Sequence, residues 1–216
     1  MILHGYFRSS AAWRCRIAFN LKGIQPKPAF VHLRRDGGEQ KKAAFRVLNP
    51  QALVPALELD DGTVLTQSMA IIEWLDETHP EPPFLPADPT GRALVRGFAD
   101  AIACDIHPLQ NLRVLTYLKK ELGQQQEGLD AWCRRWLGEG LAACEALALR
   151  HGRGKRFTFG DTPGLADICL VPQMASADRF GVDTTPMPRL REIAAACAEL
   201  RAFADAVPAR QPDAEA

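Results

Sequence analysis

The sequence predicts an α/β layer of about eighty residues followed by an all-helical region. Over the first part, short β-branched and aromatic runs alternate with stretches of helical periodicity, in the order β-α-β-α-β-β-α. Five prolines then fall within the eleven residues 79–89, and beyond them apolar residues recur only at helical spacing. Because such a proline density excludes regular structure, we predict a domain over residues 1–79, a linker over 80–89 and a second domain over 90–216.

The composition is that of an ordinary globular protein and excludes several classes of partner. Hydrophobic residues make up 47% and charged residues 24% of the 216 positions, and 26 basic side chains balance 26 acidic ones. Without a long basic run, neither a nucleic acid nor an anionic membrane surface is an expected partner. The six cysteines form no C-x-x-C pair and the five histidines show no ligand spacing, so we expect reduced thiols and no metal site. The sequence shows no signal peptide and no apolar run of about 18 residues, so we expect a cytoplasmic protein with no membrane span.

Apolar runs and turn signals predict each element of the first domain. Residues 1–6 are apolar and residues 29–33 are β-branched and aromatic, which is typical of strands. Asp61-Gly62 separates two further short strands and is a strong hairpin signal. The predicted helices are one from the Ser9-Ser10 pair to Lys22, ended by Gly23, a short one ending near Leu48, and one over residues 68–77.

The second domain is predicted to consist of long helices. Their apolar stripes cover residues 94–109, 129–147, 165–174 and 190–203. Thr90 is the expected N-cap of the first helix, and Pro108 is expected to kink it. Gly164 and Asp167 are typical of a capping box at the start of the third. The tail over residues 208–216 is polar and rich in proline and alanine, so we expect it to be loosely held.

The corner between the first strand and the first helix is the first candidate site. Arg8, Ser9 and Ser10 lie there, where the first N–H groups of a helix lack intrahelical acceptors and the helix dipole is positive. Such a corner suits an anion, whether a phosphate, a carboxylate or a thiolate. In isolation, a simple N-cap is the favoured interpretation of either serine.

Two further segments of the first domain place polar groups at the ends of strands. Val54-Pro55 precedes a predicted strand, and a cis peptide there would turn the Val54 backbone outward to pair with a peptide-like ligand. Gln67-Ser68 opens the third helix, whose N-terminus suits a carboxylate. An ordinary turn proline and an ordinary helix cap are the structural alternatives for these residues.

The helical domain offers three candidates, each with a structural alternative. His107 and Asn111 lie four residues apart and are therefore expected on one face of a helix. Arg179 is expected at the end of another helix. A surface histidine and a C-terminal cation favoured by the helix dipole explain these residues without any ligand.

Taken together, in this order and spacing, these motifs resemble the zeta class of glutathione transferases. The resemblance extends from Leu3 to Asp213. The segments that carry it are Ser9-Ser10-x-x-Trp13-Arg14-x-Arg16, Asn49-Pro50 through Val54-Pro55, Gln67-Ser68-x-Ala70-Ile71-Ile72-Glu73, Pro108-Leu109-Gln110-Asn111-Leu112 and Gln211-Pro212-Asp213. The resemblance implies the glutathione transferase architecture, with an α/β thioredoxin-like N-terminal domain and an all-α C-terminal domain, and it implies a homodimer.

The resemblance also implies a function, namely a glutathione-dependent cis–trans isomerase that converts maleylpyruvate or maleylacetoacetate to the fumaryl isomer in aromatic catabolism. The implied cofactor is glutathione and the implied substrate is a small dicarboxylate. The implied catalytic residues are Arg8, Ser9, Ser10 and Arg179, and the implied glutathione-binding residues are Gln40, Val54, Pro55, Gln67, Ser68, His107 and Asn111. Two alternatives stay open: a general zeta-class transferase acting on α-halo acids or peroxides, and a non-catalytic binding protein with the same fold. The choice between the two maleyl substrates, and any contact of Arg113 with substrate, stay open as well.

One position departs from the family's pattern. The family has a cysteine directly after the serine pair, whereas this chain has Ala11. Cys15 lies four residues further on and is not an obvious substitute. Because the implied nucleophile is the sulfur of glutathione itself, the departure does not require a loss of isomerisation.

Overall fold

The computed structural model describes residues 1–215, and these divide into two compact units. The first unit consists of Met1–Pro83 together with the residues from Leu200 onward, and the second unit is Phe84–Glu199. In contrast to the predicted division, the last segment therefore groups with the first unit. The physical reason is that α9 (Arg201–Ala204) packs against α1 (Ser10–Leu21), so its contacts lie in the α/β unit.

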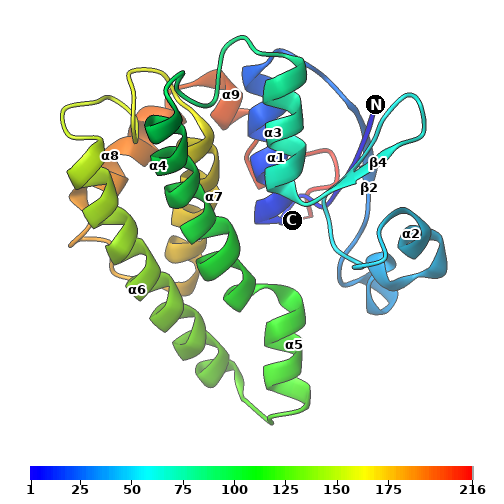
Figure 1. Ribbon diagram of the computed structural model, residues 1–216. Coiled ribbons are helices and arrows are strands. Elements are labelled where there is room, and N and C mark those ends of the chain that lie inside the picture. The colour runs from blue at the N-terminus through cyan, green and yellow to red at the C-terminus, as the bar shows by residue number, and fades with distance from the viewer. Residues whose placement is uncertain (216) are drawn as a thin grey trace. The chain divides into compact units, whose positions relative to one another are not determined.

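A four-stranded mixed sheet organises the first unit (Figure 1). Its strands are β1 (Ile2–Gly5), β2 (Lys27–Phe30), β3 (Ala56–Glu58) and β4 (Val64–Thr66), in the order β2-β1-β3-β4. β1 pairs parallel with β2 and antiparallel with β3, and β3 pairs antiparallel with β4. β2 ends three residues before its predicted end at position 33, because β1 stops at Gly5 and provides no further partner. The predicted α/β class and the Asp61-Gly62 hairpin are confirmed.

Helices α1 and α3 (Ser68–Thr78) pack against one another in the first unit (Figure 1). Ile17 and Phe19 of α1 and Ile71 and Leu75 of α3 are almost completely buried, as their apolar spacing predicts. The unit also contains α2 (Ala43–Leu48) and two short 3₁₀ turns, Arg35–Gly37 and Glu39–Lys41, before it. The first helix begins and ends where the sequence indicates, with a serine cap at its start and a glycine of positive φ after its end.

The second unit is entirely helical. Its helices are α4 (Pro89–Asp100), α5 (Leu112–Lys120), α6 (Gln126–His151), α7 (Leu165–Phe180) and α8 (Pro188–Ala198). α7 packs against α4, α6 and α8, so it forms the centre of this unit, as its nearly continuous apolar sequence predicts. Within residues 1–215, none of the helices combines the length and apolarity needed to cross a membrane.

Two helix boundaries differ from the sequence prediction, and one further helix was not predicted. The N-cap of α4 is Asp88 and not Thr90: its Oδ1 accepts a hydrogen bond of 2.7 Å from the N–H of Gly91, and Pro89 occupies the first helical position. The last predicted stripe is interrupted because Leu200 is extended, which separates α8 from α9. Helix α5 has a half-buried apolar face and was not anticipated from the apolar pattern.

The segment that leads to His107 has an unusual backbone. After α4 the chain forms a π-helical turn over Ala101–Ile106 and a 3₁₀ turn over His107–Gln110. Pro108 has no N–H and cannot continue an α-helical ladder, so the predicted kink is an interruption of the helix. Gly140 of α6 permits the close approach of this turn, because a Cβ on Gly140 would collide with the side chain of Ile106.

Residues 208–215 are attached to the first unit, so the expectation of a loosely held tail is wrong for them, and Ala216 lies outside the described residues. Asp213 accepts a hydrogen bond of 2.9 Å from the N–H of Phe7, and Glu215 lies 3.0 Å from His32 and 3.1 Å from Arg35. The few polar side chains of this segment therefore have specific partners, which composition alone does not reveal.

A buried carboxylate fixes the start of α7. Asp167 is 2% exposed and accepts hydrogen bonds from the Thr158 N–H at 2.9 Å, the Thr158 hydroxyl at 2.7 Å and the Gly164 N–H at 2.8 Å. Burial raises the pKa of Asp167, while these hydrogen bonds act in the opposite direction. The predicted capping box is confirmed, and Asp167 additionally holds the loop before α7.

We expect Asp167→Ala to lower the free energy of unfolding by about 3 kcal/mol, because three donors lose a buried acceptor. Asp161→Ala is the matched control, since Asp161 lies on the same loop but is exposed and bonds to Lys155 at the surface. Urea unfolding followed by circular dichroism measures both variants. Equal midpoints for the two variants would show that the buried carboxylate does not stabilise this unit.

Candidate functional site

The corner between β1 and α1 has the geometry of a capped helix N-terminus. Ser9 is extended, with φ −72° and ψ 115°, and its Oγ accepts a hydrogen bond of 3.2 Å from the N–H of Ala12. The N-cap interpretation of Ser9 is therefore correct. Because this bond uses only an acceptor lone pair, the hydroxyl proton of Ser9 is still available for donation to an anion.

The electrostatics of this corner favour a negative charge. The first turn of α1 contains no acidic residue, so no carboxylate of that turn opposes the positive end of the helix dipole. Arg8 is exposed beside it, and its guanidinium lies 5.1 Å from the ring centroid of Phe7. Ser10, the first residue of α1, is partly buried. The corner thus combines a hydroxyl donor, a helix N-terminus and a cation.

Neither Ala11 nor Cys15 provides a thiol to this corner. Ala11 occupies the second position of α1, where the family pattern has a cysteine. Cys15 is fully buried, and its Sγ lies 4.0 Å from the carbonyl oxygen of Ser68. Cys15 is therefore not a substitute for the missing cysteine.

A rigid turn presents the backbone of Val54. Asn49 is 1% exposed, donates from Nδ2 to the Leu53 carbonyl at 2.8 Å and accepts from the Gln51 N–H at 3.0 Å. The Val54-Pro55 peptide is cis, as the sequence suggested. Among the described residues, no hydrogen bond satisfies the N–H or C=O of Val54. These groups can pair with an extended peptide-like ligand.

The start of α3 brings a second polar corner to the same unit. Gln67 has a positive φ of 70° and donates from Nε2 to Oε1 of Gln51 at 2.8 Å, which joins the start of α3 to the turn before Val54. Ser68 is 5% exposed and is the first residue of α3. Its Oγ accepts a hydrogen bond of 3.4 Å from Nη1 of Arg14.

Arg14 is a candidate site residue that was not predicted from the sequence. It is 1% exposed, and within residues 1–215 its Nε and Nη2 have no hydrogen-bond partner. A buried guanidinium is costly unless an anion compensates it, so this arrangement fits a carboxylate bound at the N-terminus of α3. In the sequence, the only indication of a role for Arg14 is its place beside Trp13 in the family motif. Its contact with Ser68 is evident only from the structure.

Gln40 lies in the second 3₁₀ turn and is also largely buried, with 6% exposure. Its Nε2 donates to the Leu33 carbonyl at 3.3 Å, and its Oε1 has no hydrogen-bond partner among the described residues. The buried amide therefore keeps one acceptor for a ligand. Figure 1 shows how the segment between β2 and α2, which carries Gln40, extends away from the sheet.

The remaining candidates lie in the second unit. His107 begins the 3₁₀ turn, and Asn111 caps α5, accepting from the N–H groups of Arg113 at 3.1 Å and Val114 at 3.2 Å. The expectation that His107 and Asn111 share a helical face is wrong, because the backbone changes from π to 3₁₀ to α between Asp100 and Leu112. Arg179 is exposed in the last turn of α7, and its guanidinium lies 5.2 Å from the Phe180 ring.

Metal sites and disulfides each require a particular arrangement of side chains. Across residues 1–215, no group of three or more His, Cys, Asp or Glu side chains is arranged to hold a metal ion. In the same residues none of the six cysteines forms a disulfide. Burial raises the pKa of Cys133 to about 11 and that of Cys144 to about 12, so these thiols are protonated at neutral pH.

Comparison with known proteins identifies the family. Residues 8–78 match the model of the glutathione S-transferase N-terminal domain. The chain is 50% identical to a maleylpyruvate isomerase of Ralstonia sp over 213 residues, which cover 99% of both chains. It is 47% identical to the maleylacetoacetate isomerase of Pseudomonas aeruginosa, with 99% of this chain and 98% of that one covered.

Two solved structures agree over the full length of both chains. One is the holo structure of a maleylpyruvate isomerase, described as a bacterial glutathione S-transferase in the zeta class, with a TM-score of 0.95 and 50% identity. The other is a maleylacetoacetate isomerase from Methylobacterium extorquens with bound malonate and glutathione, with a TM-score of 0.95 and 40% identity. Each of these matches covers 100% of this chain and 100% of the solved chain. The architecture expected from the sequence motifs is therefore confirmed, and the chain belongs to the zeta class of the glutathione S-transferase family.

Proposed function

We propose that this protein is a glutathione-dependent cis–trans isomerase that converts maleylpyruvate or maleylacetoacetate to the fumaryl isomer in aromatic catabolism. The observation that carries this proposal is the corner at the start of α1, where Ser9 caps a helix whose first turn contains no acidic residue. The names of the full-length relatives, at 45–50% identity, support the same activity. Relatives have also been solved with glutathione bound.

The groups left unpaired in the first unit fit the parts of glutathione. The γ-glutamyl carboxylate suits Gln67, Ser68 and the buried cation of Arg14 behind them. The central peptide of glutathione suits the unpaired N–H and C=O of Val54, which the cis Pro55 peptide follows. The open acceptor of the buried Gln40 amide suits a further donor of the tripeptide.

The proposal extends to residues of the second unit on the strength of the family likeness. His107 and Asn111 are assigned to glutathione. Asn111 uses its Oδ1 to cap α5, so its Nδ2 is the group available to donate to a ligand. Arg179 is assigned to a carboxylate of the substrate.

The chemistry requires a sulfur anion at neutral pH and a place for two carboxylates. When bound, glutathione supplies a thiol, whose anion adds reversibly to the cis double bond and so permits rotation about that bond. The Ser9 hydroxyl donates to this anion, and the N-terminus of α1, which Ser10 opens, favours it over the protonated thiol. Arg8 and Arg179 hold the carboxylates of the substrate and stabilise negative charge that develops during the reaction. Since the chain's own thiols take no part, Ala11 is compatible with this assignment.

Four further assignments follow from the family likeness and the composition. We assign a homodimer, a cytoplasmic location, and no role for nucleic acid or membrane. The general zeta-class transferase acting on α-halo acids or peroxides is the principal alternative to the isomerase. The non-catalytic binding protein is the second alternative, and the hydroxyl and cation at the α1 corner argue against it.

We expect the isomerisation of maleylpyruvate or maleylacetoacetate, followed by the ultraviolet absorbance of the substrate, to require glutathione. Ser9→Ala should reduce kcat/KM about 100-fold, because the variant loses a hydroxyl donor to a buried anion. Thr63→Ala, which removes an exposed hydroxyl from the β3–β4 turn, is the matched control and should retain the wild-type rate. Equal wild-type rates with and without glutathione would overturn the proposal, and turnover of dichloroacetate without any isomerisation would favour the general transferase.

The proposed pairing of Arg14 with a carboxylate of glutathione leads to a separate prediction. We expect Arg14→Met to raise the KM for glutathione at least tenfold, which corresponds to about 1.4 kcal/mol, because a bound carboxylate loses its buried cation. Stability without glutathione should not fall, because a methionine fills the space without an unpaired buried charge. Arg46→Met, at an exposed arginine of α2, is the control for both measurements. An unchanged KM together with a lower unfolding midpoint would make Arg14 a purely structural residue.

A further inference from the structure

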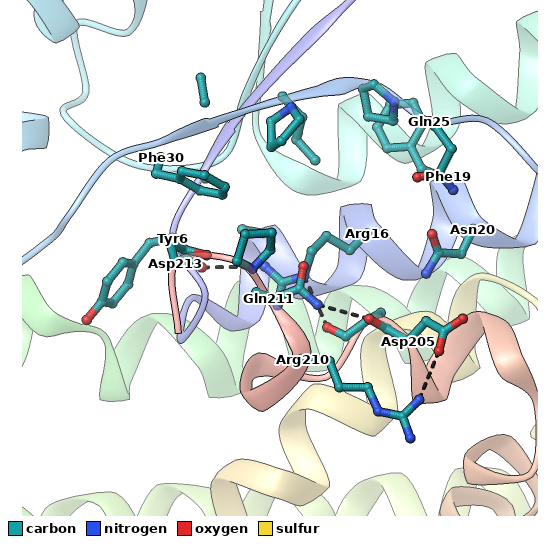
Figure 2. A pocket seen from close by; sticks show the side chains of 18 residues that line it. Tyr6, Arg16, Phe19, Asn20, Gln25, Phe30, Asp205, Arg210, Gln211 and Asp213 are labelled. Carbon is teal, nitrogen blue, oxygen red and sulfur yellow. Dashed lines mark hydrogen bonds and ion pairs between the residues drawn. The ribbon is translucent and has the colours of Figure 1, made fainter. Parts of the chain in front are cut away.

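The C-terminal motif Gln211-Pro212-Asp213 takes no part in the proposed chemistry, yet it lies against the segment that carries the catalytic corner. Together with α1 and β2 it encloses a cavity of about 340 Å³ in the first unit, shown in Figure 2. Arg16, Gln211 and Asp213 line this cavity, whereas none of the predicted site residues does. These three side chains form hydrogen bonds to the backbone of the same unit, so they hold parts of the chain in place.

The backbone of Phe7 is held from both sides. Its N–H donates to Oδ2 of Asp213 at 2.9 Å, and its carbonyl oxygen accepts from Nη2 of Arg16 at 3.0 Å. Phe7 is 3% exposed and directly precedes Arg8 and Ser9. Two side chains from segments about two hundred residues apart thus fix the peptide groups on either side of one corner residue.

Arg16 connects the corner to the C-terminal segment. Besides the Phe7 carbonyl, it donates from Nε to the Ala206 carbonyl at 3.1 Å and from Nη1 to the Tyr6 carbonyl at 3.5 Å. Burial lowers the pKa of Arg16 to about 10, whereas the nearby Asp213 carboxylate acts to raise it. The guanidinium is therefore charged at neutral pH, and Asp213 is its acidic neighbour.

Asp213 is itself held between two attachment points. Before it, Nε2 of Gln211 donates to the carbonyl oxygens of Asp205 at 2.9 Å and Val207 at 3.0 Å. After it, Ala214 packs against the core cluster that includes Phe7, and Glu215 pairs with Arg35 at 3.1 Å. The chain is therefore attached to the unit both before and after Asp213, and these attachments fix the position of its carboxylate.

We propose that Asp213 and Arg16 are positioning residues, which fix the Phe7 backbone and thereby the directions of Arg8 and Ser9 toward the substrate and the thiolate. This inference rests on the proposed function, because it assigns the C-terminal segment a role in the same site. The two residues act through the backbone and contact neither glutathione nor substrate. A displacement of about 1 Å at a reacting group costs roughly 100-fold in rate, so a backbone clamp is sufficient to affect catalysis.

Three variants of the full-length protein test the clamp. Asp213→Ala removes the acceptor of the Phe7 N–H, and Asp213→Asn keeps an amide oxygen as acceptor without the charge. Arg210→Gln is the control on the same segment, because Arg210 is exposed and its guanidinium pairs with the Asp205 carboxylate rather than with Phe7 or Asp213. We expect Asp213→Ala to lower kcat 10- to 100-fold with little change in the KM for glutathione, because binding groups elsewhere are intact. Asp213→Asn should recover most of the rate, and Arg210→Gln should match wild type. All rates are measured at a temperature at which every variant is fully folded by circular dichroism.

Amide hydrogen exchange at Phe7, followed without substrate or glutathione, provides an independent readout. In the Asp213→Ala variant the Phe7 N–H should exchange faster than in wild type, while in Arg210→Gln it should not. A wild-type kcat for Asp213→Ala, an Asp213→Asn variant as slow as Asp213→Ala, or unchanged protection at Phe7 would each overturn the inference. If the wild-type protein shows no isomerase activity, the proposed function fails, and the exchange measurement alone then decides whether the clamp exists.

Discussion

The first turn of a helix leaves backbone N–H groups without intrahelical acceptors, and in this protein the proposed chemistry depends on where that turn of α1 points. The turn lies directly after the central strand β1, so its direction follows from the sheet. Ser9 satisfies one N–H of the turn through its Oγ and keeps a proton to donate. With no acidic side chain in that turn, the local field favours an anion. Arg8 and Ser9 lie at this corner, and Arg16 and Asp213 hold the backbone just before it.

Polar side chains that are buried or half-buried in the first unit support the corner in different ways. Arg16 and Asp213 hold the peptide groups of Phe7, just before the corner. Arg14 lies one turn into α1 and reaches Ser68 at the start of α3. The packing of α1 against α3 therefore brings two helix N-termini into one unit, each with a serine and each suited to a negative group. Two such sites in one unit match a ligand that carries both a thiolate and a carboxylate, as glutathione does with its central cysteine thiol and its γ-glutamyl carboxylate.

Local signals were sufficient to predict much of this architecture. The Ser9 cap, the Asp61-Gly62 hairpin and the cis Val54-Pro55 peptide depend on a few neighbouring residues, so their physics is present in the sequence itself. The end of β2, the partners of Arg14 and the attachment of Asp213 depend on residues distant in the chain, which spacing and composition do not encode. The family likeness supplied the residue roles, but it did not indicate why Gln211-Pro212-Asp213 belongs to the motif set. The structure supplies a physical reason, because that segment reaches the corner from the opposite end of the chain.

The central claim is that this corner stabilises a thiolate. The pKa of a free cysteine thiol is about 8.5, and a hydroxyl donor at a helix N-terminus lowers the pKa of a thiol bound there. Titration of the wild-type protein with bound glutathione, followed by the ultraviolet absorbance of the thiolate, measures this pKa directly. The account predicts a pKa for bound glutathione below that of free glutathione titrated under the same conditions. An identical pKa for the bound and the free thiol would contradict it.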